Sequence, residues 1–151
     1  MAVLVLGYRG KSLISKLIRW QTRSQYSHVS VEIDGQNYEA WHIGGVVRRS
    51  WNEGHTSGTQ VDVLRPVNTV NVVRMRHFLE QQIGKGYDYK GVLRFLSRRD
   101  ERLDNRWFCS ELVAQAFIEG MCVLQNMRPS YLTPRDICMS PQLTVVGRRI
   151  V

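Results

Sequence analysis

The strongest constraint on the fold of this chain is a segment of alternating polar and apolar residues, 28–33, followed directly by a tight-turn signal. Residues 28–33 alternate between polar and β-branched apolar side chains, the pattern of a half-buried strand. Asp34-Gly35 is a two-residue turn signal, and residues 36–40 can return as the partner strand. We therefore expect an antiparallel sheet built on this hairpin. The residues that would face its core are Val29, Val31 and Ile33.

Pairing across the turn would bring two chemically useful side chains together. It places Glu32 near Asn37, and it sets His28, on the face away from the core, beside residues 39–41. The Glu39 carboxylate could then reach the His28 imidazole. A carboxylate beside an imidazole fixes its tautomer and stabilises its cation. Taken singly, such a histidine commonly caps a strand, and such a glutamate commonly faces solvent.

A second informative stretch, residues 107–114, predicts a helix with Cys109 near its amino end. The apolar residues recur near helical spacing, Asp104 and Asn105 could cap the helix, and Gly120 could stop it. A thiol in the first turn faces the positive end of the helix dipole, which favours thiolate. Cys109 is therefore a candidate nucleophile with His28 as its base, although most free cysteines are small buried apolar residues.

The remaining elements follow from periodicity and from glycine and proline positions. We expect His55 to be solvated, because it lies in a polar, glycine-containing loop without a spacing partner. The expected strands are 2–6 (ended by Gly7 and Gly10), 46–48, 61–64 (closed by Pro66), and 143–146 with 149–151 (broken at Gly147). The expected helices are 12–23, 70–83, a short one through Leu93 and Leu96, and one starting at 133–137; residues 51–60 form the loop and 98–102 an exposed turn.

Length and cysteine usage narrow the class of protein. The 151 residues suit one domain, residues 1–151, and the hydrophobic fraction of 43% is ordinary for a globular protein. The three cysteines, Cys109, Cys122 and Cys138, are an odd number without a CxxC pair. This pattern argues against a disulfide framework or a structural zinc site, and we expect neither metal nor cofactor.

The net charge of +8 predicts attraction to polyanions. The basic side of helix 12–23 could meet an anionic polymer or a membrane surface, but no recognition helix or RNA-binding signature predicts specific nucleic-acid binding. No apolar run is long enough to span a bilayer, and residues 1–6 are too short for a signal peptide, so we expect a cytoplasmic protein. No residue indicates an oligomeric state.

The order of the motifs resembles the circularly permuted, NlpC-like branch of the papain-like cysteine hydrolases, the YiiX-like family. In ordinary members the cysteine helix precedes the histidine strands, whereas here His28 precedes Cys109. The resemblance implies an α+β fold with an antiparallel sheet or small barrel packed against helices. The matching segments are Ser27–Val31, Tyr38–Ala40, Gly86-Tyr87, Phe108–Val113 and Thr133–Asp136.

The resemblance also implies roles for individual residues. Cys109 would be the nucleophile, His28 the general base and Glu39 the third member of a Cys-His-Glu triad. Tyr87, in a segment like the family's Gly-x-x-Tyr, would help to stabilise an oxyanion, with Tyr89 as its rival. Tyr26 would line the cleft.

Three functions remain open at this stage. The first is a thiol peptidase or amidase acting on a peptide, such as a cell-wall peptide, although Phe108 and Glu111 replace the Asp and Gly that flank the cysteine in wall-cutting relatives. The second is an acyltransferase or thioesterase of the lecithin:retinol acyltransferase type on lipid substrates, although Ser110-Glu111 departs from that group's Glu-His. The third is a basic module that binds a polyanion without catalysis. A wall enzyme without a signal peptide would need another route, such as delivery by a phage.

Overall fold

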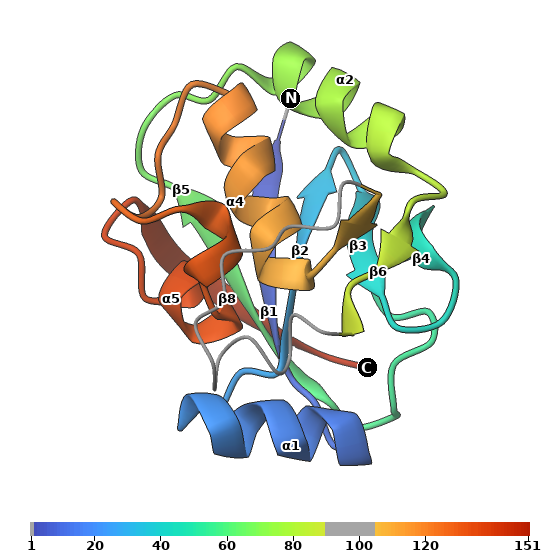
Figure 1. Cartoon of the computed structure of the whole chain (residues 1–151). Helices are drawn as coiled ribbons and strands as arrows, with labels where there is room; N and C mark the ends of the chain where they lie inside the picture. Colours follow the sequence, from blue (N-terminus) through green and yellow to red (C-terminus); the bar gives the residue numbers. More distant parts are fainter. Residues whose placement is uncertain (1, 90–104) are drawn as a thin grey trace.

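The computed structural model describes residues 2–89 and 105–151, and its centre is an antiparallel sheet of six strands. The strand order is β4-β3-β2-β1-β5-β8, with helices α4 and α5 over one face (Figure 1). The predicted α+β class, an antiparallel sheet packed against helices, is confirmed. The strands are β1 (Val3–Arg9), β2 (His28–Ile33), β3 (Gln36–Trp41), β4 (Gly45–Arg49), β5 (Gln60–Pro66) and β8 (Leu143–Ile150).

The predicted hairpin forms β2 and β3 in the expected register. Glu32 lies opposite Asn37, and the hydrogen-bonded pairs begin at the turn and run as far as Val31 opposite Tyr38. Asp34 and Gly35 both have positive φ, 50° and 81°, as a two-residue turn between twisted strands requires. Beyond Val31 and Tyr38, β2 still pairs with β1 and β3 still pairs with β4, but β2 and β3 no longer pair with each other, so their ladder opens there.

Helix α4 forms the core layer because its buried side packs against β2 and β3. Val29, Val31 and Ile33 are fully buried against it, as the alternation predicted. Helix α1 instead crosses the ends of the central strands (Figure 1). The helices are α1 (Leu13–Thr22), α2 (Val72–Gln82), α4 (Cys109–Glu119) and α5 (Pro134–Cys138), and a 3-10 turn spans Pro129–Tyr131.

Two glycines that we expected to break strands instead lie within them. Gly7 lies inside β1. A glycine is needed there because the layer that carries Cys138 approaches closely, and a Cβ would be 2.6 Å from the Cys138 sulfur. Gly147 is inside β8, opposite Val63, and the register shift beside it makes Val146 the extra residue of a bulge. Both strands are therefore longer than predicted.

The prediction that Asn105 caps the start of α4 was also wrong. Asn105 is not the cap; its carbonyl accepts a hydrogen bond from the Gly86 N–H, which starts a two-stranded parallel ribbon. Because that ribbon occupies residues 106–107, α4 begins only at Cys109, with Phe108 at the N-cap position. The ribbon consists of β6 (Gly86–Tyr87) and β7 (Arg106–Trp107).

The later predicted elements are largely confirmed. Gly120 ends α4, and α5 begins with Pro134 inside a capping box between Thr133 and Asp136. The expected short helix through Leu93 and Leu96, the turn at 98–102 and the cap residue Asp104 lie outside the described residues. In the described ranges no helix is both long and apolar enough to cross a membrane.

Candidate functional site

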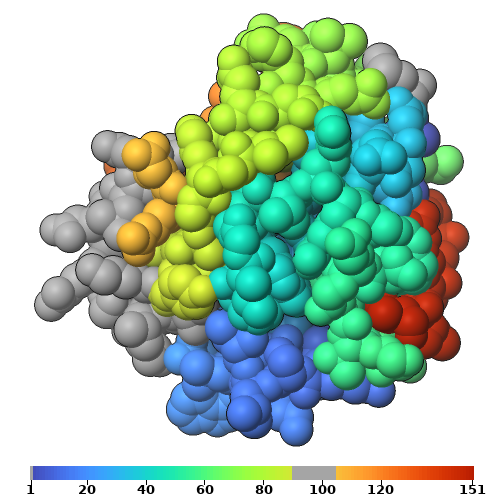
Figure 2. Space-filling model, turned by 90° about the vertical axis from the view of Figure 1, so that its right-hand side faces the viewer, coloured from blue at the N-terminus to red at the C-terminus, as the bar shows by residue number. Residues whose placement is uncertain are grey.

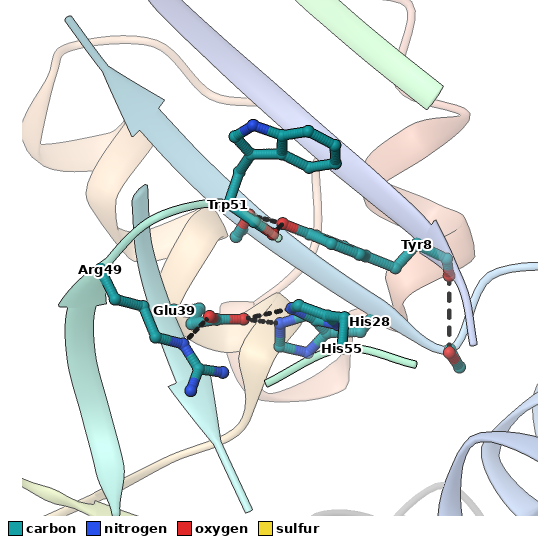
Figure 3. Close-up of polar contacts among 8 residues, drawn as sticks. Tyr8, His28, Glu39, Arg49, Trp51 and His55 are labelled. Atoms are coloured by element: carbon teal, nitrogen blue, oxygen red, sulfur yellow. Dashed lines mark hydrogen bonds and ion pairs between the residues drawn. The ribbon is translucent and has the colours of Figure 1, made fainter. Parts of the chain in front are cut away.

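His28 and Glu39 lie together at the open end of the hairpin. The His28 Nε2 atom is 2.6 Å from Glu39 Oε2, and the Glu39 side chain is fully buried (Figure 3). Both project from the sheet face opposite α4. The residues that follow them, Val29 and Ala40, belong to the core against that helix, and neighbouring side chains of a strand point to opposite faces. The structure thus brings this predicted pair into contact, through the strand register that the sequence indicated.

His55 is a third member of this cluster, and our expectation that it is solvated was wrong. Its side chain is only 5% exposed, and its Nε2 lies 3.2 Å from the same Glu39 oxygen. The ring stacks on Tyr8, with centroids 4.0 Å apart. The Tyr8 hydroxyl donates to the Trp51 carbonyl at 2.7 Å, which ties the loop down over the sheet. Nothing in the loop's composition signals this tertiary contact.

Arg49 completes the charge balance of the cluster. Its Nε donates to the other Glu39 oxygen at 2.7 Å (Figure 3). Its guanidinium lies over the Trp41 ring, 4.9 Å from the ring centroid. Burial raises the pKa of Glu39, but hydrogen bonds from His28 and His55 outweigh burial and hold that pKa well below its usual range. The carboxylate is therefore ionised at neutral pH and can only accept hydrogen bonds.

The same burial sets the protonation state of His28. Desolvation lowers the pKa of His28 more than the hydrogen bond to Glu39 raises it, so the ring is neutral near pH 7. A neutral ring that donates to an ionised carboxylate carries its proton on Nε2. Nδ1 is then the nitrogen with the available lone pair, so His28 can accept a proton there.

Cys109 is the first residue of α4, as predicted, but its thiol is not ionised in this state. The residue is 1% exposed, and burial raises the pKa of its thiol to about 12. Backbone N–H groups of Val29, Ser110 and Cys109 point at the sulfur and lower the pKa only in part. The helix end favours thiolate as expected, but desolvation is the larger effect at this site.

The thiol and the His28 ring approach the same opening from opposite faces of the sheet. The sulfur contacts the N–H of Val29, the residue directly after His28, where the β2–β3 ladder has opened. Within residues 2–89 and 105–151, no hydrogen bond joins the Cys109 sulfur to the His28 ring. The structure therefore places the Cys109 sulfur against the backbone next to His28, without a hydrogen bond between the two side chains.

The three tyrosines occupy different surroundings. Tyr87 is buried near the thiol, and burial is the main cause of its raised pKa. Tyr89 is exposed, and its hydroxyl donates to the His42 carbonyl. Tyr26 lies in another cluster, because its hydroxyl donates to Asp62 at 2.6 Å rather than facing the His28 pair.

Two hollows adjoin the cluster. A cavity of about 20 Å³, room for about one water molecule, separates α1 residues such as Ile14 and Ile18 from His28 and Tyr87. A larger hollow of about 380 Å³ opens beside His55. Its lining includes residues from 10–15, 41–43 and 54–59, segments that adjoin one another on the face shown in Figure 2.

Comparison with solved structures finds a likeness over the entire chain. The crystal structure of the metalloprotein yiiX from Escherichia coli O157:H7, described as DUF1105, matches with a TM-score of 0.74 at 17% sequence identity. The match covers 100% of this chain and 98% of that protein. No family model matches the sequence, and no curated protein matches it. The likeness confirms a YiiX-like fold.

Proposed function

We propose that this chain is a thiol-dependent hydrolase with a circularly permuted papain-like fold. Cys109 would be the nucleophile, His28 the general base, and Glu39 the group that orients His28. The observation that carries the proposal is the 2.6 Å contact between His28 and Glu39, beside the opening where the Cys109 sulfur lies. That contact leaves His28 Nδ1 as a proton acceptor, as a base for a thiol must have.

The chemistry would proceed in two halves. The Cys109 proton moves to His28 Nδ1, the thiolate forms a C–S bond with an amide carbonyl, and the carbonyl π pair moves to oxygen. The oxyanion would be held by the Cys109 N–H and the Tyr87 hydroxyl; loss of such a donor costs about 3 kcal/mol in the barrier. The oxyanion pair then re-forms the carbonyl, the C–N bond breaks, and His28 gives its proton to the leaving amine. Water next attacks the thioester carbonyl, the C–S bond breaks, and the acid and the free thiol are released.

Substrate access requires a covering element to move, because Cys109 and His28 are both buried. Helix α1 is suited to this role. It closes the small cavity over His28 and Tyr87, yet Ile18 is its buried residue, whereas α4 buries most of its length. A helix held by so little burial costs little free energy to displace.

The class of substrate that we favour is an amide in a peptide, and a cell-wall peptide fits the family resemblance. One observation favours the second candidate, an acyltransferase or thioesterase acting on lipids. The outward side of α1 exposes Leu13, Leu17 and Trp20 beside basic residues, and such a surface could meet acyl chains at an anionic interface. The Cys109 and His28 chemistry would be the same for both.

An electrophilic activity-based probe tests the mechanism. We expect the probe to modify Cys109 in the wild type and in the matched variant Cys122→Ala, as mass spectrometry of peptides would show. Cys109→Ala should lose both labelling and turnover while keeping its circular dichroism spectrum. Muropeptides and short-chain acyl esters, offered separately, would then distinguish the two substrate classes. Full turnover by Cys109→Ala on a confirmed substrate would refute the proposal.

A further inference from the structure

Three side chains converge on one point of the sheet face away from α4. His28 comes from the start of β2, Glu39 from β3 and His55 from the β4–β5 loop, and both imidazole Nε2 atoms approach Glu39 Oε2 (Figure 3). One ligand atom from each residue lies within 4.8 Å of the others. Three buried polar groups from separate segments are therefore directed at one small volume.

The chemistry of these donors matches a known class of metal site. Two neutral imidazoles and one carboxylate are a common ligand set for Zn²⁺, which prefers four tetrahedral ligands at about 2.0–2.2 Å. Ligand atoms in such a tetrahedron are about 3.3 Å apart, so the 2.6 Å contact of His28 with Glu39 would widen slightly. The three ligand atoms, which lie within 4.8 Å of one another, would adopt that spacing through rotation of their side chains.

The surroundings would orient the ligands as metal sites require. Arg49 holds the second Glu39 oxygen at 2.7 Å, and Tyr8 stacks on His55. The hollow of about 380 Å³ that His55 and Arg49 help to line lies beside the cluster, and a fourth ligand such as water would have to enter from it. The Arg49 charge opposes a second cation nearby, so we expect reversible rather than permanent binding.

We propose that His28, Glu39 and His55 form a binding site for a divalent transition-metal ion of the zinc class, and that the bound ion switches off the thiol chemistry. The second half of this statement rests on the proposed function. An ion on His28 takes the Nε2 lone pair, and the ring proton must then sit on Nδ1. With Nδ1 protonated, His28 cannot accept the Cys109 proton.

Binding is tested first, without any activity measurement. The full chain, stripped with a chelator, is titrated with Zn²⁺ by calorimetry, and with Co²⁺ by the visible absorption of a tetrahedral site. We expect one ion per chain in the wild type and at least about tenfold weaker binding in His55→Gln and Glu39→Gln. The matched control His77→Gln, an exposed histidine on α2, should bind as the wild type does.

Further variants decide where the ion sits. Cys109→Ala should keep its affinity, because the thiol is not a ligand in this proposal. Loss of binding in Cys109→Ala, unchanged binding in both His55→Gln and Glu39→Gln, or no binding by the wild type would each overturn the site. Circular dichroism spectra and melting curves would show that each compared variant is folded.

The regulatory half has its own readout. For each protein, probe labelling of Cys109 is measured with and without Zn²⁺, and the ratio of the two rates is compared. We expect the ratio to fall at least about tenfold in the wild type, to recover with chelator, and to stay near one in His55→Gln. An unchanged wild-type ratio despite measured binding would overturn the switch. No labelling of the metal-free wild type would instead refute the hydrolase, while the binding data would stand.

Discussion

Replacing Glu39 with glutamine should destabilise the fold far more than the same change at Glu80. Glu39 is fully buried and accepts hydrogen bonds from three groups, one of them the Arg49 guanidinium, whose side chain is only 15% exposed. Glutamine keeps the shape but not the charge, so Arg49 would be left with an uncompensated buried charge. Removing one partner of a buried ion pair costs about 3–5 kcal/mol.

The corresponding shift in melting temperature can be worked out from chain length. An unfolding entropy of about 2.1 cal/mol/K per residue gives roughly 0.3 kcal/mol/K for 151 residues. A loss of about 3 kcal/mol then lowers the melting temperature by about 9 °C, without a large change in the urea m-value. Calorimetry and urea unfolding at pH 7 measure both quantities.

Glu80 supplies the matched control on the surface. It accepts hydrogen bonds from the Tyr38 hydroxyl and from Arg48, as Glu39 does from its own partners, but its side chain is 38% exposed. Solvent can replace these contacts, so Glu80→Gln should shift the melting temperature by less than half as much. Equal shifts for the two variants would refute the claim that Glu39 is the electrostatic centre of a buried cluster.

Three further predictions follow from the burial of the site and the packing of the sheet. Ile18→Ala should loosen α1, because Ile18 is its buried residue, and should speed alkylation of Cys109 at least about tenfold by mass spectrometry; an unchanged rate would mean that α1 does not control access. Gly7→Ala should cost about 1–3 kcal/mol in urea unfolding, since its Cβ would be 2.6 Å from the Cys138 sulfur, whereas Gly147→Ala, with no atom within 4 Å, should cost clearly less. Because burial raises the pKa of Cys109 to about 12, its alkylation rate should still be rising at pH 10 in the folded protein, where a denatured sample has levelled off; a plateau near pH 8.5 would contradict the sealed thiol.

The hairpin was predictable because its information is local. Alternation assigned the two faces of β2, and the turn at Asp34 and Gly35 fixed the register. The register was then sufficient to predict the contact between His28 and Glu39, which lie in adjacent strands. The position of Cys109 at the start of a helix was readable for the same reason, from spacing and from the glycine that stops α4.

The features that sequence reasoning missed depend on contacts between distant segments. His55 lies in a loop without periodicity, and its place beside Glu39 depends on its stacking against Tyr8. Gly7 was interpreted as a strand break because the true reason for a glycine there, the close approach of Cys138, is a contact between distant segments. The thiol of Cys109 was expected to ionise because the local sequence does not reveal how deeply the residue is buried, and burial has the larger effect on its pKa.

The bulge in β8 bears on how the molecule behaves at high concentration. This strand is at the end of the sheet order and carries exposed Val145, Val146 and Ile150, a combination that could recruit strands from other molecules. The extra residue at Val146 twists the strand and interrupts a flat template. Arg148 and Arg149 further along the strand are held by ion pairs to Asp62 and Glu32. We therefore expect the irregularity beside Gly147 to lower the tendency of this apolar edge to pair with strands of other molecules.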